Sequence, residues 1–228
     1  MRKWDEASAT QLRGSFSMRV IYLHGFASSP SSRKARFFQE KFGALGIPFE
    51  APALDQGDFR GLTVTQQLAF VETLLPAAGA LVMGSSLGGY LAALLAAGHP
   101  EIVRLVLLAP AFNFYQRWVS QMTAEQLTEW EQKSEAPVFH YGTGREMPIG
   151  FQFIADAKWH DPFPSFSQPA LFFHGVRDTV VPIESTLRYQ ETHPNVRLFR
   201  MDSGHQLTDV LDLIWQRTED FLMERPAF

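Results

Sequence analysis

A serine between glycines stands where a short apolar run gives way to a helical pattern. Gly84-Ser85-Ser86-Leu87-Gly88 fits G-x-S-x-G, follows ALVM and precedes LGGYLAALLA. In a sharp turn from a strand into a helix, the glycines leave room for a strained serine with an exposed hydroxyl. Such a hydroxyl can attack a carbonyl carbon when a base removes its proton. We predict Ser86 as a nucleophile; the alternative is a glycine-rich turn with a solvated serine.

The base and the carboxylate that such a serine needs follow it in two later loops. Asp178 comes after the apolar run ALFFHG, and His205 comes after VRLFRM. Because the carboxyl ends of parallel strands lie on one edge of a sheet, these loops can bring Ser86, Asp178 and His205 together. We therefore predict His205 as the base and Asp178 as the acid that orients it, in the order Ser, Asp, His.

Other residues compete for these two roles. Asp202 lies three positions before His205 and is the alternative acid. We prefer Asp178 by position, although Asp178 and His205 could instead merely cap the elements that follow them. Six other histidines compete for the role of the base: His24, His99, His140, His160, His174 and His193. Among all the histidines, only His205 lies in a loop that follows a predicted strand after the acid.

Two backbone N–H groups are needed to hold the negative oxygen that forms when a carbonyl is attacked. One is expected at Leu87, directly after Ser86 and at the start of a helix, where the helix dipole favours negative charge. The other is expected at Phe26, in the loop HGFASSP after the first predicted strand. We expect His24 to brace that loop by a hydrogen bond rather than to take part in catalysis.

Alternating strand and helix patterns must position these residues. They run from residue 18 to 111 and from 169 to 228, and they predict an α/β fold with a mostly parallel sheet of about six strands and helices on both faces. The strands are expected at 18–24, 47–52, 80–84, 103–109, 170–174 and 196–201. The helices are expected at 32–45, 63–75, 87–97, 183–191 and 207–223.

The stretch 112–168 interrupts this alternation. It contains one clear helical pattern, at 123–133, and many aromatic residues. We interpret it as a cap inserted over the site, which favours an apolar acyl or aromatic substrate group. The residues predicted to line the substrate pocket are Tyr90, Phe112, Phe114 and Trp159.

Three cationic residues lie near the Phe26 loop, where they could bind a phosphate-bearing substrate. They are Arg33, Lys34 and Arg36, and we interpret them as the solvated face of a helix.

Composition excludes several other functions. The chain has 228 residues, a formal net charge of −4 and no basic run, which argues against binding nucleic acid. The absence of cysteine excludes thiolate metal sites and a cysteine nucleophile. No apolar stretch reaches the roughly 20 residues of a membrane span. Residues 1–17 lack the apolar centre of a signal peptide, so we expect a leader or an expression-derived segment and a cytoplasmic protein.

The motifs together resemble the α/β-hydrolase superfamily. YLHGFASSPSSRKA and MGSSLGGYLAALLA resemble the small YqiA-like esterases, which open with an HGF-x-SSP-x-S-x-KA loop and carry a GSSLGGY elbow. The resemblance spans most of residues 18 to 225 and is weak across 112–168. It implies a serine esterase without metal or cofactor, in which Ser86, His205 and Asp178 form the triad, and Phe26 and Leu87 hold the oxyanion.

The predicted reaction is hydrolysis of a small-molecule carboxylic ester, with a short acyl or aromatic group, through an acyl-enzyme. A thioesterase, lactonase, C–C-bond hydrolase or peptidase would use the same triad. A non-catalytic binding module is a further alternative, but it would usually have lost one member of the triad. The sequence gives no indication of the oligomeric state.

Overall fold

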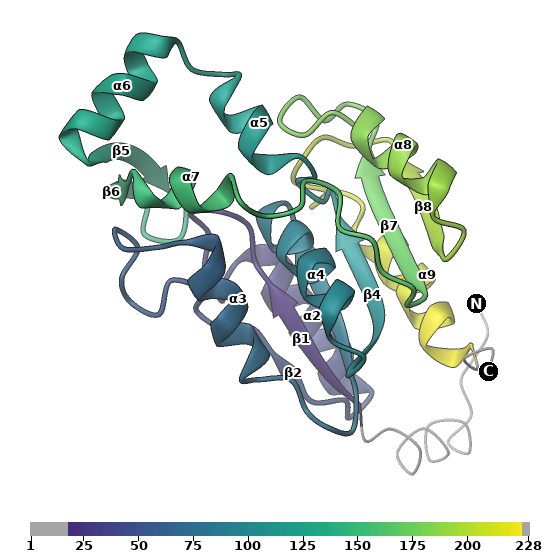
Figure 1. Cartoon of the computed structure of the whole chain (residues 1–228). Coiled ribbons are helices and arrows are strands. Elements are labelled where there is room, and N and C mark those ends of the chain that lie inside the picture. The colour runs from purple at the N-terminus through teal and green to yellow at the C-terminus, as the bar shows by residue number, and fades with distance from the viewer. Residues whose placement is uncertain (1–17, 225–228) are drawn as a thin grey trace.

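The computed structural model describes residues 18–224, and its centre is a six-stranded parallel sheet (Figure 1). The strands lie in the spatial order β2-β1-β3-β4-β7-β8. The predicted parallel sheet is therefore confirmed, whereas the expected leader at residues 1–17 lies outside the described residues. The strands are β1 (Arg19–Leu23), β2 (Phe49–Glu50), β3 (Ala80–Ser85), β4 (Ile102–Leu108), β7 (Ala170–Gly175) and β8 (Val196–Met201).

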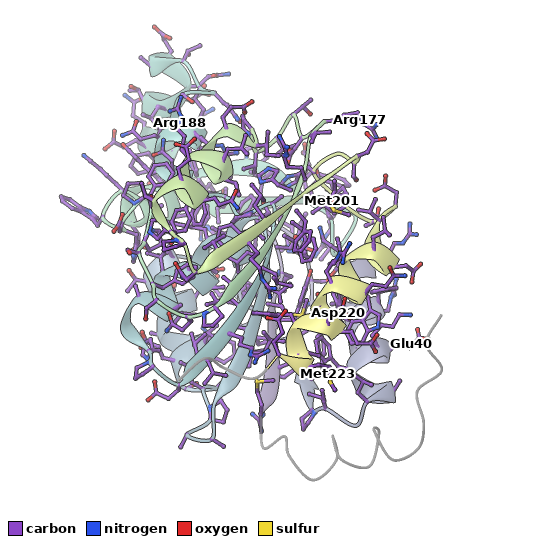
Figure 2. All side chains as sticks on the ribbon, turned by 90° about the vertical axis from the view of Figure 1, so that its right-hand side faces the viewer. Glu40, Arg177, Arg188, Met201, Asp220 and Met223 are labelled. Atoms are coloured by element: carbon purple, nitrogen blue, oxygen red, sulfur yellow. The ribbon has the colours of Figure 1, made fainter. Side chains whose placement is uncertain are left out.

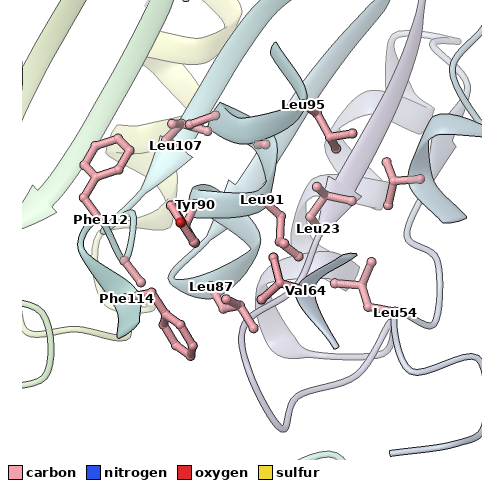
Figure 3. Close-up of a cluster of buried hydrophobic side chains, with 14 of the residues drawn as sticks. Leu23, Leu54, Val64, Leu87, Tyr90, Leu91, Leu95, Leu107, Phe112 and Phe114 are labelled. Carbon is pink, nitrogen blue, oxygen red and sulfur yellow. The ribbon is translucent and has the colours of Figure 1, made fainter. Parts of the chain in front are cut away.

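Helices cover both faces of the sheet because successive strand residues point to opposite sides. Ile21 and Leu23 of β1 join the core beneath α3, α4 and α8, which Figure 3 shows in close-up. Val20 and Tyr22 join the core beneath α2 and α9, and Figure 2 views the molecule from the side of α9. These helices are α2 (Arg33–Ala44), α3 (Val64–Glu72), α4 (Leu87–Gly98), α8 (Glu184–Thr192) and α9 (Leu211–Met223).

The order of the strands creates a crevice beside β3. From β1 the chain moves outward to β2 and then returns to β3 on the other side of β1. The loops after β1 and β3 therefore leave neighbouring strands at their carboxyl ends, where open α/β sheets bind ligands. Phe26 lies in the first of these loops and Ser86 in the second.

The segment between β4 and β7 has more structure than its sequence pattern indicates. Beside the expected helix it holds two short helices and an antiparallel hairpin, and Figure 1 shows it beyond the carboxyl ends of the strands. The short helices are too brief to show a period, and Pro137 and Pro148, which face each other in the hairpin, argue against strands in the sequence. The elements are α5 (Phe114–Val119), α6 (Ala124–Lys133), β5 (Glu135–His140), β6 (Arg145–Gly150) and α7 (Gln152–Ala157).

The two largest differences between predicted and observed elements lie in the last helix and in the second strand. The last helix begins at Leu211 and not at residue 207, because Leu207 has a φ of 56° and residues 207–210 form a turn. The predicted strand 47–52 contributes only Phe49 and Glu50 to the sheet edge. In the described part of the chain, no helix combines the length and the apolar character that crossing a membrane requires.

Candidate active site

Ser86 occupies the strained turn between β3 and α4. Its backbone has φ 55° and ψ −118°, a conformation that side-chain-bearing residues rarely adopt. The turn is held by a hydrogen bond from the amide of Ser86 to the carbonyl of Leu108, at 2.9 Å. A Cβ on Gly84 would overlap the carbonyl of Gly88, and a Cβ on Gly88 would overlap the carbonyl of Leu23. The two glycines therefore allow α4 to start directly against the sheet.

Gly88→Ala is expected to destabilise the protein by about 2–3 kcal/mol, because the backbone of Leu23 would have to move to admit the new methyl group. The measurement is thermal or urea unfolding of the purified variant. Gly98→Ala is the matched control, since Gly98 ends the same helix and a Cβ there meets nothing within 4 Å. Equal unfolding midpoints for the two variants would show that the elbow tolerates a side chain.

The side chains of Ser86, His205 and Asp178 form a continuous hydrogen-bonded chain. The Nδ1 of His205 lies 2.7 Å from Asp178 Oδ2, and its Nε2 lies 3.1 Å from Ser86 Oγ. Because an ionised carboxylate only accepts hydrogen bonds, Nδ1 carries the proton and Nε2 is left to accept from the serine hydroxyl. This is the arrangement in which a histidine can remove the proton of a serine.

Asp178 is held in place and kept ionised by the groups around it. Its Oδ1 accepts hydrogen bonds from the amides of Val180 and Val181, at 2.9 and 2.8 Å. Burial alone would raise the pKa of Asp178, but hydrogen bonds from His174, His205 and the Val181 amide hold it well below its usual range. The side chain is fully buried, so its charge faces these donors rather than water.

His174 is a second histidine beside Asp178, and in the sequence it is only one of several competing candidates for the base. Its Nε2 lies 2.8 Å from the Val181 carbonyl and 3.3 Å from Asp178 Oδ2. A carbonyl only accepts, so Nε2 carries the proton and Nδ1 accepts from the hydroxyl of Thr186, at 2.8 Å. His174 thus acts as a fixed hydrogen-bond donor beneath the loop of Asp178. Its position four residues before Asp178 is the feature of the sequence that could have indicated this contact.

The structure places the alternative acid and the other histidines elsewhere. Asp202 pairs with Arg177, and its side chain is 84% exposed. His24 donates from Nδ1 to the carbonyl of Gly25 and accepts from the amide of Leu54. This geometry fits the expected bracing of the loop after β1. The remaining histidines contact groups away from Ser86: His99 with Glu72, His140 with Thr143, His160 with Thr65, and His193 with Tyr189.

The two predicted oxyanion donors lie beside Ser86 in one cleft. Phe26 and Leu87 both line it together with Ser86 and His205. Among the described residues, no group accepts a hydrogen bond from the backbone N–H of Phe26 or of Leu87. The ring of Phe26 is fixed against Trp118 and Phe153, with centroid distances of 4.9 and 5.1 Å. These contacts hold the loop after β1 over the serine.

The cleft has a volume of about 890 Å³ and an aromatic wall formed by Phe26, Phe114, Trp118 and Tyr141. Of the four residues predicted to bind substrate, only Phe114 lines it. Tyr90 is buried beneath α5 and donates its hydroxyl to the carbonyl of Asp161, while Phe112 stacks on Tyr189 in the core. Trp159 is 82% exposed and away from the cleft. These three residues therefore lie outside the lining of the cleft, because aromatic content alone does not show which way a side chain points.

Cationic side chains form another part of the cleft wall. Arg33 and Arg36 are exposed, as expected of a solvated helix face, whereas Lys34 is buried, contrary to that interpretation. Arg33, Lys34, Arg36 and Arg117 all line the cleft. Lys34 is buried and donates to the carbonyl of Gln206, at 2.9 Å. Burial lowers the pKa of the Lys34 ammonium to about 8, although the charge of Asp178 opposes this shift. The sequence feature that could have indicated the burial of Lys34 is its position one helical turn before the buried Phe38.

No group of three or more histidine, aspartate or glutamate side chains in residues 18–224 is arranged to hold a metal ion.

Solved structures similar to this chain are α/β hydrolases. Alpha/beta hydrolase domain-containing protein 10 from mouse aligns with a TM-score of 0.77 and 22% identity, over 91% of this chain and 90% of that chain. A structure of ferulic acid bound to Est1E from Butyrivibrio proteoclasticus aligns with a TM-score of 0.78 and 19% identity, over 92% and 90%. A structure from work on LipS and LipT, two metagenome-derived lipolytic enzymes, aligns with a TM-score of 0.67 and 20% identity, over 91% of this chain and 94% of that chain. At such identities these matches establish the fold.

The family comparison covers nearly the whole described chain. No curated protein matches the sequence. One family model, described as Uncharacterised protein family (UPF0227), matches residues 19–222 and so includes β1 through nearly all of α9. The resemblance predicted from the HGF and GSSLGGY motifs is therefore confirmed: the chain belongs to UPF0227, the family of the YqiA-like esterases, and it has the fold of the α/β hydrolases.

Proposed function

We propose that the protein is a serine hydrolase that cleaves carboxylic esters through an acyl-enzyme. The observation that supports this best is the hydrogen-bonded chain from Asp178 through His205 to Ser86, at 2.7 and 3.1 Å. It opens into a cleft that also contains the amides of Phe26 and Leu87. A binding module would have no need of this arrangement.

In the first step, Ser86 Oγ forms a bond to the ester carbonyl carbon while its proton moves to His205 Nε2. The carbonyl oxygen becomes negative and accepts hydrogen bonds from the amides of Phe26 and Leu87. The carbon–oxygen bond to the alcohol then breaks, and His205 gives its proton to the departing oxygen. Asp178 stays ionised and stabilises the imidazolium that forms.

In the second step, water attacks the acyl-enzyme and gives its proton to His205. The bond between the acyl carbon and Ser86 Oγ breaks, and His205 returns the proton to the serine. The products are a carboxylic acid and an alcohol, and the enzyme is restored. No cofactor enters this sequence of bonds.

The segment 112–168 is proposed as the cap of this site. Phe114, Trp118 and Tyr141 come from it and line the cleft, and the amide of Gly142 donates to the carbonyl of Ala27, at 3.3 Å. The aromatic wall favours an apolar acyl or aromatic group on the substrate. The solved structure of Est1E with ferulic acid, an aromatic carboxylic acid, supports this size and class of ligand for the fold.

A fluorophosphonate probe tests the proposal directly, because it reacts with serines that a neighbouring base activates. We expect a covalent adduct on the peptide that contains Ser86, located by mass spectrometry, and turnover of short p-nitrophenyl esters. Ser85→Ala should still be labelled and Ser86→Ala should not. Absence of labelling in the folded wild-type protein would contradict the proposed nucleophile.

A further inference from the structure

The wall of the cleft carries cations and lacks carboxylates. Four cationic side chains line it, those of Arg33, Lys34, Arg36 and Arg117, whereas its lining includes no aspartate or glutamate. The whole chain has the opposite balance, with 20 lysines and arginines against 24 aspartates and glutamates. The positive charge is therefore concentrated at the cleft rather than typical of the surface.

None of these four cations has a carboxylate within 4 Å among the described residues. Arg33 and Arg36 are exposed on the first turn of α2, beside the hydroxyls of the loop that precedes it. Arg117 Nη2 donates to the carbonyl of Val180, but its Nη1 is buried without a hydrogen-bond partner in residues 18–224. A buried cationic donor without a partner is costly, so this atom indicates an anionic group that comes with the substrate.

Lys34 and Arg117 lie on the side of the cleft where the leaving group departs. Lys34 Nζ contacts the carbonyl of Gln206, the residue after His205. Arg117 contacts Val180, two residues after Asp178. Because His205 gives its proton to the departing oxygen, the alcohol part of an ester must lie beside these loops. The aromatic wall of Phe26, Phe114 and Trp118 leaves the acyl part to the other side.

We infer that the preferred substrates are esters whose leaving group carries a carboxylate or a phosphate. This inference rests on the proposed esterase function and names the substrate class of the same site. The anion pairs with the guanidinium of Arg117 and with Arg33 and Arg36 at the rim, while Lys34 adds charge from beneath. The anion takes no part in bond making, and the acyl carbon–oxygen bond is broken as in any other ester.

Matched substrates separate the charge from the size of the leaving group. The two substrates are the m-butyryloxybenzoate anion and the corresponding neutral primary amide, which differ only in the charge of the leaving group. Each enzymatic rate is divided by the rate of hydrolysis by hydroxide, which corrects for the intrinsic reactivity of the ester. We expect kcat/KM to favour the anionic ester by about tenfold at low ionic strength, as for one charge-assisted hydrogen bond. The preference should fall with added salt. The butyrate ester of m-hydroxyphenyl phosphate shows whether a phosphate on the leaving group is preferred to a carboxylate. A comparison of the p-nitrophenyl monoester of adipic acid with p-nitrophenyl hexanoate shows whether a negative charge on the acyl group is also preferred.

Charge-neutral variants test which residues recognise the anion. Arg117→Gln is expected to lower the ratio of anionic to neutral turnover by about threefold or more. Because Arg117 also holds Val180, the double variant Arg33→Gln with Arg36→Gln, two exposed positions, should lower the ratio independently. Arg188→Gln is the matched control for Arg117→Gln: Arg188 is exposed on α8 and labelled in Figure 2, and its replacement removes the same single positive charge outside the cleft. That variant should keep both rates.

The outcomes separate this inference from the function on which it rests. Equal turnover of the neutral and anionic esters would overturn the inference and leave the esterase proposal standing. A preference for the anion only on the acyl side, or one that survives in both the Arg117 and the double variant, would also overturn it. Turnover of neither ester, together with no fluorophosphonate labelling, would overturn both.

Discussion

Replacing Ser86 by alanine is expected to lower kcat for ester hydrolysis by about 10⁶-fold, close to the rate without a triad. The variant keeps the glycines of the elbow and the pair of His205 and Asp178, so it removes the attacking oxygen and little else. KM should change much less than kcat, because the hydroxyl contributes little to binding. The measurement is steady-state turnover of p-nitrophenyl esters by the purified variant.

Ser85→Ala is the matched control for this substitution. Ser85 is the neighbouring residue at the end of β3 and is buried, but the hydroxyl that meets His205 Nε2 is that of Ser86. Its replacement removes an equivalent hydroxyl from the same turn and should leave turnover within about tenfold of wild type. A loss of tenfold or less in Ser86→Ala, or an equal loss in both variants, would mean that Ser86 does not attack the substrate.

The sequence predicted the elements that hold the site because their signals are local and strong. Short apolar runs alternate with helical periods, so the parallel order follows, and with it the common edge at which strands end. Ser86, Asp178 and His205 each lie in the loop or turn after such a run, and the structure brings their side chains within hydrogen-bond distance. The wrong boundary at residue 207 has a local cause, since a φ of 56° at a leucine leaves no trace in the pattern of apolar residues.

The walls of the cleft could not be predicted in this way, because they depend on how distant segments pack. Tyr90 has helical spacing that places it in the core as readily as in a pocket, and the core is where it lies. Arg117 and Lys34 look like ordinary surface cations in the sequence. They reach the cleft only because α5 lies against the loop of Val180 and α2 against the loop of Gln206.

Asp178→Asn is expected to lower kcat by about 10⁴-fold, through the wrong tautomer of His205. The amides of Val180 and Val181 both donate to Oδ1, so the asparagine oxygen must occupy that place. Its NH₂ group then faces His205 Nδ1, from which the wild-type carboxylate accepts a hydrogen bond. An NH₂ group donates, so the imidazole proton moves to Nε2, which can then no longer accept the proton of Ser86. Steady-state turnover and the rate of fluorophosphonate labelling should fall together.

Asp202→Asn is the matched control, because it removes the same charge three residues from His205. The carboxylate of Asp202 is largely exposed and pairs with Arg177, so its loss should change kcat by no more than about twofold. His174 adds a complication, since its Nε2–H also faces Asp178 Oδ2, and an amide there loses this contact. Thermal unfolding of both variants therefore accompanies the kinetics. If folded Asp178→Asn kept its activity while Asp202→Asn lost it, the carboxylate that orients His205 would be Asp202, and the loop after β8 would have to rearrange during catalysis.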